Sequence, residues 1–158
     1  MCSSDLAAVE ALGKGEISGV VLWGVNPAYD SRLAAKWTDG LKKAKTTIAI
    51  AGRMNETAAA CKLVAAANHA LESWGDHEAV AGLAAVQQPL VNPLFDTRQG
   101  EDLLLAWAGA TNAQGKSADA HGFVVDYWHA QVAVRSDDAQ TFEHFWDKTL
   151  NDGFADLK

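Results

Sequence analysis

The stretch that decides the fold runs from Gly19 to Asp30 and reads GVVLWGVNPAYD. It begins as an uninterrupted apolar run, which is too short to span a membrane and lacks polar alternation. Such a run predicts a strand that is buried on both faces of a sheet. The run ends at Gly24, which allows a turn or the close approach of a ligand, and Pro27 keeps Asn26 out of the helical conformation. We therefore expect a central strand of an α/β domain, with a turn at its end that a ligand could approach.

Composition limits the classes of partner. The chain has 158 residues and is 49% hydrophobic, which is enough for a single core. Its formal charge is −7 and its pI is near 5.1, with no basic cluster. Nucleic acids and anionic membrane surfaces attract concentrated Lys and Arg, so we expect neither as a partner. No apolar segment approaches the roughly 20 residues of a membrane-spanning helix, so we expect no direct membrane insertion.

The first six residues, Met1–Leu6, have neither the charged nor the apolar region of a signal peptide. They match the translation of the end of a common sequencing adapter that is read from a GTG start. Our hypothesis is that this segment is not native and that the reading frame is broken. Cys2 then has no native role, and Cys61 is expected to be a small buried hydrophobe. Two cysteines so placed form no zinc or iron–sulfur pattern.

A second strand is predicted over Thr46–Ala51, because this segment is β-branched and mostly apolar. Between the two strands, apolar residues at helical spacing predict a helix that Asp30 or Ser31 would cap. A strand-helix-strand order favours parallel pairing. A short helix over Glu56–Cys61, capped by Asn55, follows the second strand.

A third strand is predicted over Lys62–Ala66, followed by an irregular segment over residues 68–76. One or two short strands, divided at Gly82, are expected within Ala81–Leu90. A helix then opens near Glu101 and closes at Gly109. Two amphipathic helices complete the chain, and their aromatic stripes are expected to form core. The stripes contain Phe123, Val124, Tyr127 and Trp128 in one helix, and Phe142, Phe145, Trp146 and Leu150 in the other.

These elements predict an α/β fold: a partial Rossmann-like parallel sheet flanked by helices, with a helical C-terminal part. We place the α/β domain at residues 7–110, a polar loop at 111–120 and the C-terminal helices at 121–158.

Ligands of parallel α/β sheets bind outside the carboxyl ends of the strands. Three such ends are predicted, at Gly24–Tyr29, Gly52–Asn55 and Asn68–Asp76, and their side chains are expected to converge on one crevice. The candidate binding residues are Gly24, Asn26, Arg53, Glu72 and Asp76, with His69 beside them. The acidic residues and His77 fit no standard metal spacing, so we expect no metal site. The sequence contains no nucleophile, phosphate-loop or metalloprotease motif, and we expect no catalytic residue in this chain alone.

Several stretches together resemble the molybdopterin oxidoreductases. They are most similar to the molybdopterin-like half of the iron–sulfur subunit of alternative complex III, a bacterial quinol:electron acceptor oxidoreductase. The resemblance rests on Gly24–Asp30, Glu56-Thr57, Leu71–Asp76, Gln88–Phe95, Asp126–Trp128, Phe142–Trp146 and Asn151–Gly153. It covers residues 7–153. The segment Cys61–Ala66 departs from the family, which usually has Ala-Asp, an apolar residue and Leu-Pro at this place.

The resemblance implies a fragment of a larger subunit of a respiratory complex on the periplasmic side of the inner membrane. The implied partners are the remainder of the same subunit, a multihaem cytochrome and polytopic membrane subunits. Iron–sulfur clusters would belong to the parent subunit, and this chain would hold no cofactor. It would then be a non-catalytic scaffold without molybdenum.

Two alternatives remain open. The chain could be a fragment of an active oxidoreductase that depends on molybdopterin dinucleotide, with Asn26, Arg53 and the loop Glu72–Asp76 lining a nucleotide crevice. It could also be a stand-alone nucleotide-binding or other small α/β protein.

Overall fold

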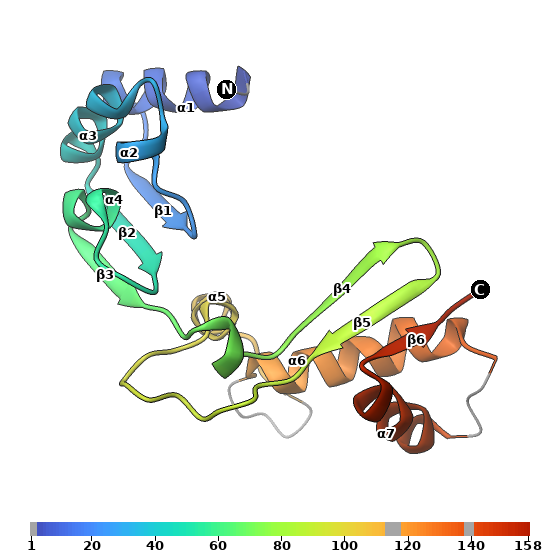
Figure 1. Ribbon diagram of the computed structural model, residues 1–158. Coiled ribbons are helices and arrows are strands. Elements are labelled where there is room, and N and C mark those ends of the chain that lie inside the picture. The colour runs from blue at the N-terminus through green and yellow to red at the C-terminus, as the bar shows by residue number, and fades with distance from the viewer. Residues whose placement is uncertain (1–2, 113–117, 138–140) are drawn as a thin grey trace. The chain divides into compact units, whose positions relative to one another are not determined.

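The computed structural model describes residues 3–112, 118–137 and 141–158 (Figure 1). The chain divides into two compact units, and each is described by itself. Unit 1 comprises Met1–Ala67 and Asp96–Arg98, and unit 2 comprises Asn68–Phe95 and Gln99–Lys158. Met1 and Cys2, on which the hypothesis of a non-native start depends, lie outside the described residues. Part of the predicted loop, residues 113–117, also lies outside them.

Unit 1 contains a three-stranded parallel sheet in the order β1-β2-β3. The strands are β1 (Gly19–Trp23), β2 (Thr46–Ala51) and β3 (Leu63–Ala66). The α/β fold with a parallel sheet is therefore confirmed. The prediction that the first strand is central is wrong, because β2 lies between the other two in the described sheet. Its helices are α1 (Ser3–Lys14), α2 (Pro27–Asp30), α3 (Ala34–Lys43) and α4 (Glu56–Ala60).

The helices of unit 1 cover one face of the sheet. Leu22 of β1 packs in a buried cluster with residues of α1 and α3 and with Ala44 just beyond α3, and the end of α4 packs against the same cluster. The buried members of this cluster are Val9, Leu12, Leu22, Trp37, Leu41 and Ala44. Because α3 and α4 belong to successive strand-helix-strand connections, both connections cross the same face.

The opposite face of the parallel sheet is apolar and is exposed at β1 and at the start of β3, whereas Ile50 of β2, which pairs with Trp23 on this face, is buried. Alternate residues of a strand point to opposite faces, so Val21 and Trp23 point away from the Leu22 cluster. They are 45% and 41% exposed, and Leu63, which shares their face through the register with Ile48, is 57% exposed. The prediction that the first strand is buried on both faces is therefore wrong. In β1 the continuous apolar sequence contains residues of a covered face, such as Leu22, and residues of an exposed face, Val21 and Trp23.

The start of α3 also differs from the prediction. Pro27 stands at the first position of a separate short helix, α2, because its fixed φ is suited to a helix start. The helix α3 then begins after Leu33, whose N–H donates to Ser31 Oγ over 3.1 Å. Neither Asp30 nor Ser31 caps α3 directly. In contrast, the predicted cap of α4 is confirmed, since Asn55 Oδ1 accepts from the N–H of Ala58 over 2.8 Å.

Unit 2 contains an antiparallel sheet in the order β4-β5-β6. Its strands are β4 (Gly75–Val80), β5 (Leu83–Gln87) and β6 (Phe154–Asp156), and its α-helices are α5 (Gly100–Ala108), α6 (Ala120–Tyr127) and α7 (Phe142–Asp152). Short helical turns lie at Ala70–Glu72, Trp128–Val132 and Ala133–Arg135. The strand β5 confirms the expectation of a strand after Gly82, whereas β4 and β6 were not predicted.

The core of unit 2 is built around Trp128, which is buried. Its indole packs on Phe145 and, edge to face, on Trp146, with ring centroids 6.2 and 5.6 Å apart. The aromatic stripe of α7 is thus core, as predicted. In the other stripe Val124 and Trp128 are buried, but Phe123 and Tyr127 are exposed.

Cys61 is only half-buried. It packs against the Leu22 cluster, and this partial burial raises the pKa of its thiol. The expectation of a buried cysteine is therefore wrong. In the part of the chain that the structure describes, no helix has the length and apolar character that crossing a membrane requires.

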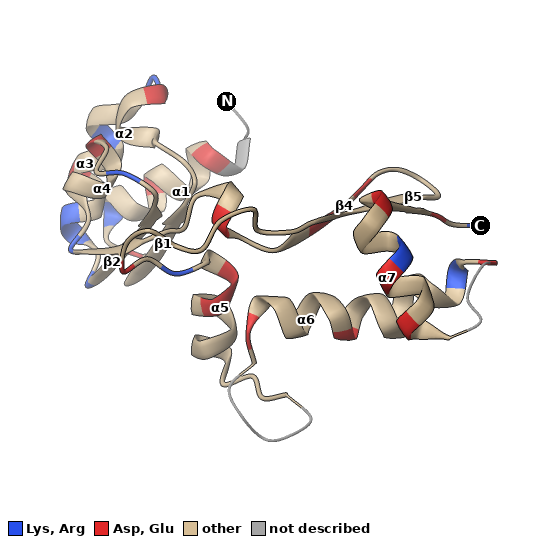
Figure 2. Cartoon of the chain, turned by 60° about the horizontal axis from the view of Figure 1, so that its bottom comes forward, with Lys and Arg blue, Asp and Glu red and all other residues tan. Residues whose placement is uncertain are grey.

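The two units differ in charge. Unit 2 has thirteen Asp and Glu against four Lys and Arg, which gives a formal charge of −9. Unit 1 has seven acidic and nine basic residues, which gives +2, and the two values sum to the −7 of the whole chain. In Figure 2 most of the blue Lys and Arg residues lie on the helices and loops around α1 to α4 of unit 1, and a few lie near α7 of unit 2. The acidity of the protein therefore belongs to unit 2.

The two faces of β1 lead to a direct test. We expect Val21→Lys to change the free energy of unfolding by no more than about 1 kcal/mol, because Val21 is exposed. The matched variant, Leu22→Lys, places a charge in the buried cluster and should destabilise the protein by about 3 kcal/mol or more. Urea denaturation of both variants measures the difference. Similar losses in the two variants would contradict the assignment of the faces.

Candidate functional site

The candidate site begins where β1 ends. Gly24 has a φ of +64°, in the left-handed region that favours glycine, and its N–H donates to the carbonyl of Ile50 on β2. Asn26 follows with φ −130° and ψ 59°, outside the helical region, and Pro27 opens α2. The backbone therefore turns sharply at the carboxyl end of the strand, as Gly24 and Pro27 predict.

The side chain of Asn26 joins this turn to the start of α4. Its Oδ1 accepts from the backbone N–H of Thr57 over 3.1 Å and from Thr57 Oγ1 over 2.7 Å. Its Nδ2 donates to Glu56 Oε2 over 2.8 Å. Thr57 Oγ1 in turn accepts from the N–H of Ala28 over 3.0 Å. Asn26 thus uses its amide oxygen and one of its two amide N–H donors within the fold.

This network has an electrostatic consequence at Glu56. The hydrogen bond from Asn26 Nδ2 lowers the pKa of the Glu56 carboxyl below its ordinary value, with a further contribution from its own backbone amide. The buried Thr57 provides the other anchor of the network. The sequence presents Glu56-Thr57 as part of the family resemblance, but nothing in the sequence pairs these residues with Asn26, about thirty positions earlier. Sequence reasoning therefore missed Glu56 and Thr57 as site residues.

A cavity of about 660 Å³ lies against this corner. Its lining contains the backbone turn from Gly24 to Pro27, Leu22 and Trp37 from the core, and the charged residues Asp30 and Arg32. The lining therefore combines apolar groups with charged groups of both signs. A ligand that binds at the end of β1 would lie here, beside Gly24 and Asn26.

The remaining candidates lie elsewhere. Arg53 is exposed after β2 and does not line this cavity. Glu72 and Asp76 belong to unit 2. Since each unit is described by itself, the convergence of all five candidates on one crevice stays a prediction. Within unit 2, Glu72 and Asp76 line different cavities.

Glu72 is held by the backbone. Its Oε2 accepts from the N–H of His69 over 2.8 Å, and its Oε1 accepts from the N–H of Leu94 over 3.1 Å. These hydrogen bonds lower the pKa of the Glu72 carboxyl. With both oxygens engaged, Glu72 fixes the loop around it. Among the described residues, no group of three or more His, Cys, Asp or Glu is placed to hold a metal ion.

Asp76 contacts the core of unit 2. Its Oδ2 accepts from the indole Nε1–H of Trp128 over 2.9 Å. Two residues further along β4, Glu78 forms a two-pronged ion pair with Arg135, with N···O distances of 2.8 and 2.7 Å. The Arg135 guanidinium lowers the pKa of Glu78 from 4.5 to about 2, helped by the N–H of Gly82. Both carboxylates therefore tie β4 to the helical segments.

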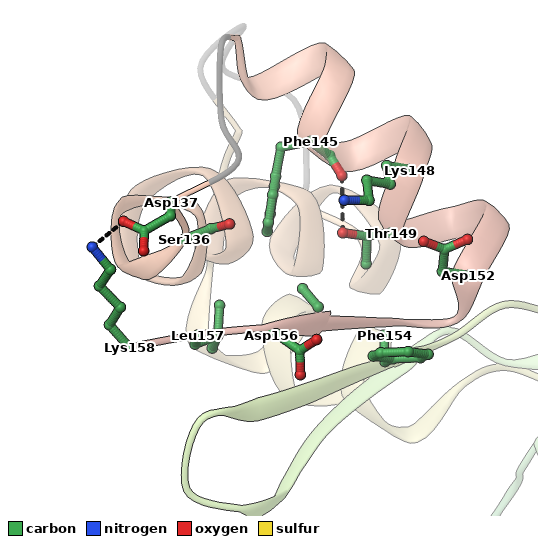
Figure 3. Close-up of a pocket in the computed structure, with 11 residues that line it drawn as sticks. Ser136, Asp137, Phe145, Lys148, Thr149, Asp152, Phe154, Asp156, Leu157 and Lys158 are labelled. Atoms are coloured by element: carbon green, nitrogen blue, oxygen red, sulfur yellow. Dashed lines mark hydrogen bonds and ion pairs between the residues drawn. The ribbon is translucent and has the colours of Figure 1, made fainter.

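A further cavity, of about 390 Å³, lies between α7 and β6 (Figure 3). Lys158 is paired with Asp137 at its edge, and Thr149 Oγ1 donates to the carbonyl of Phe145 in its wall. Asp152 and Asp156 add negative charge, and Lys148 adds positive charge. Because the charges are mixed and partly paired, we assign no ligand to this cavity.

The Asn26 network predicts a loss of stability in Asn26→Leu. This variant keeps the branched shape of the side chain but leaves the buried N–H and hydroxyl of Thr57 without their acceptor, so we expect a loss of about 1–3 kcal/mol in urea denaturation. The control, Asn92→Leu at an exposed position, should change stability by no more than about 0.5 kcal/mol. In Asn26→Leu the pKa of Glu56, followed by NMR, should rise toward its ordinary value. An unchanged Glu56 titration would contradict the network.

The Glu78–Arg135 pair predicts a pH dependence. The folded pKa of Glu78 is depressed, so its stabilising contribution is present above pH 4.5 and is lost as the pH falls toward about 2. We expect Arg135→Gln to raise the pKa of Glu78 toward 4.5 and to weaken the fall in stability between these two values. NMR titration of Glu78 and acid denaturation measure both effects. Lys42→Gln, which removes a pair with Asp39 in unit 1, should leave the Glu78 titration unchanged.

A comparison with models of protein families finds no match to this chain, and a search of curated proteins finds no similar sequence. The resemblance to the molybdopterin oxidoreductases therefore stays a prediction that rests on the quoted motifs.

Proposed function

We propose that this chain is part of a larger subunit that resembles the molybdopterin-like half of the iron–sulfur subunit of alternative complex III. In this proposal it acts as a non-catalytic scaffold in a membrane-associated electron-transfer complex, on the periplasmic side of the membrane. Its partners would be the remainder of its own subunit, a multihaem cytochrome and polytopic membrane subunits. Iron–sulfur clusters would lie in the parent subunit, outside this chain.

The observation that carries the proposal is the face of the parallel sheet on which the residues of β1 and Leu63 of β3 are exposed, around the buried Ile50 of β2. Purely parallel sheets occur almost only with both faces covered, because their strand connections place helices over them. In unit 1 the connections through α3 and α4 cover the same face, and Val21, Trp23 and Leu63 are exposed on the other. Such a face favours a sheet that is completed by further protein.

The corner at Asn26 supports a structural role for this region. A residue whose main task is to bind a ligand keeps polar atoms directed at that ligand, whereas both ends of the Asn26 amide are engaged by Thr57 and Glu56. The side chain therefore braces the sheet against α4. This is the behaviour expected of a scaffold that has retained the corner without a bound cofactor.

One observation favours the alternative of an active molybdopterin enzyme. The cavity of about 660 Å³ beside Gly24 and Asn26 lies at the carboxyl end of β1, where ligands of α/β sheets bind. In that case the backbone at Gly24, rather than the engaged Asn26 side chain, would contact the nucleotide end of the cofactor. The cofactor would supply the oxygen-atom or electron-transfer chemistry, and these residues would only position it.

Metal and pterin content of the parent subunit separates the two proposals. The subunit is purified from native membranes under mild detergent, and its iron, molybdenum and tungsten are measured against protein. We expect co-purification with a haem-containing subunit and polytopic membrane subunits, iron at cluster stoichiometry, and neither molybdenum nor tungsten. Stoichiometric molybdenum or tungsten with a pterin would overturn the scaffold proposal and support the alternative.

A further inference from the structure

We propose that the cavity between β4 and α6 binds a small methylated ammonium compound. This cavity has a volume of about 370 Å³ and lies wholly within unit 2. Its apolar lining includes Val124, Trp128 and Val132, which belong to the core. Its volume lies within the range of small-molecule sites. The site is separate from the corner at Asn26 and does not depend on the proposed function.

Two exposed aromatic side chains line this cavity. Phe123 and Tyr127 are four positions apart on α6, a spacing that places them on the same side of the helix. They are 57% and 46% exposed, whereas Val124 and Trp128 in the same stripe are buried. The faces of aromatic rings attract organic cations, and this attraction strengthens as the cation is desolvated. The two rings can therefore attract a bound cation electrostatically, in addition to giving it apolar contact area.

A carboxylate is available at the same place. Asp76 uses Oδ2 to accept from the Trp128 indole over 2.9 Å, which fixes its orientation. Within the described residues, its Oδ1 has no hydrogen-bond or ion-pair partner. The other lining carboxylate, Glu78, is neutralised by its two-pronged pair with Arg135. Asp76 is thus the negative charge in the lining that a bound cation can pair with.

Two exposed aromatic rings beside a carboxylate favour a methylated ammonium over a primary ammonium as the ligand. A primary ammonium is strongly hydrated and requires several acceptors, but Asp76 provides a single open oxygen. A methylated ammonium needs fewer acceptors, and its methyl groups can contact Val124, Val132 and the aromatic rings. The formal charge of −9 on unit 2 also raises the local concentration of cations.

The test is a titration of the full chain with choline, followed by the NMR cross-peak of the Trp128 indole N–H. The matched neutral compound is 3,3-dimethylbutan-1-ol, in which carbon replaces the quaternary nitrogen. We expect choline to shift this cross-peak with saturation, and the neutral compound to bind about tenfold more weakly. No saturable shift with choline, or equal affinity for the two compounds, would overturn the proposal.

Three variants locate the binding. Asp76→Asn keeps an acceptor oxygen for Trp128 but removes the negative charge. Tyr127→Leu and Phe123→Leu keep apolar area but remove the aromatic ring. Each of the three variants should weaken choline binding by about threefold or more. The control is Trp107→Leu, an exposed aromatic on α5 outside this cavity, which should bind choline as the original chain does. A dispersed Trp128 cross-peak confirms folding in each variant. Original affinity in all three folded variants, or a loss of affinity in the control alone, would overturn the proposal.

Discussion

The parallel pairing of β1 with β2 is the constraint on which the rest of unit 1 depends. Two parallel strands cannot be joined by a tight turn, so the chain must return along the sheet through a long connection. Residues 24–45 provide this connection as α2 and α3, and residues 52–62 repeat the arrangement with α4 before β3. Both connections pass over the Leu22 face. Because both connections pass over one face, Leu22 and Trp37 are buried while Val21 and Trp23 on the other face stay exposed.

Parallel pairing also explains how the corner is assembled. The carboxyl ends of β1 and β2 lie at the same edge of the sheet, so the residues that follow each strand are neighbours in space although about thirty positions separate them in sequence. Asn26 follows β1, and Glu56 and Thr57 follow β2. In unit 2, Trp128 at the end of α6 also brings together segments that are distant in sequence. A hydrogen bond to Asp76 holds it to β4, and aromatic packing holds it to α7. In each unit, a polar side chain in or just after a strand hydrogen-bonds to a residue of a helical segment.

The sequence predicts those strands and helices whose local residue pattern reflects their burial in the fold. The bounds of β1 and β2 follow from apolar and β-branched runs between glycines and polar residues, and the cap at Asn55 follows from its place before an alanine-rich segment. The strand β4 was missed because every residue after Gly75 in it is exposed, and its sequence, GDHEAV, has no apolar alternation. The three-residue β6 was missed because its pairing with β5 comes from about seventy residues earlier in the chain. The partners of Asn26 and Asp76 were missed for the same reason, since tertiary pairing leaves no mark in one sequence.

The chemistry of asparagine explains why this residue type occupies the corner at position 26. The position requires an acceptor for the two donors of Thr57 and a donor for the carboxylate of Glu56. An aspartate would supply the acceptor but would place a negative charge against Glu56, and a leucine would supply neither. Asparagine meets both needs while remaining uncharged, and Pro27 adds the fixed start of α2. The Asn-Pro pair is therefore accounted for by the hydrogen bonding of the fold, and its occurrence at the end of β1 does not by itself require a ligand.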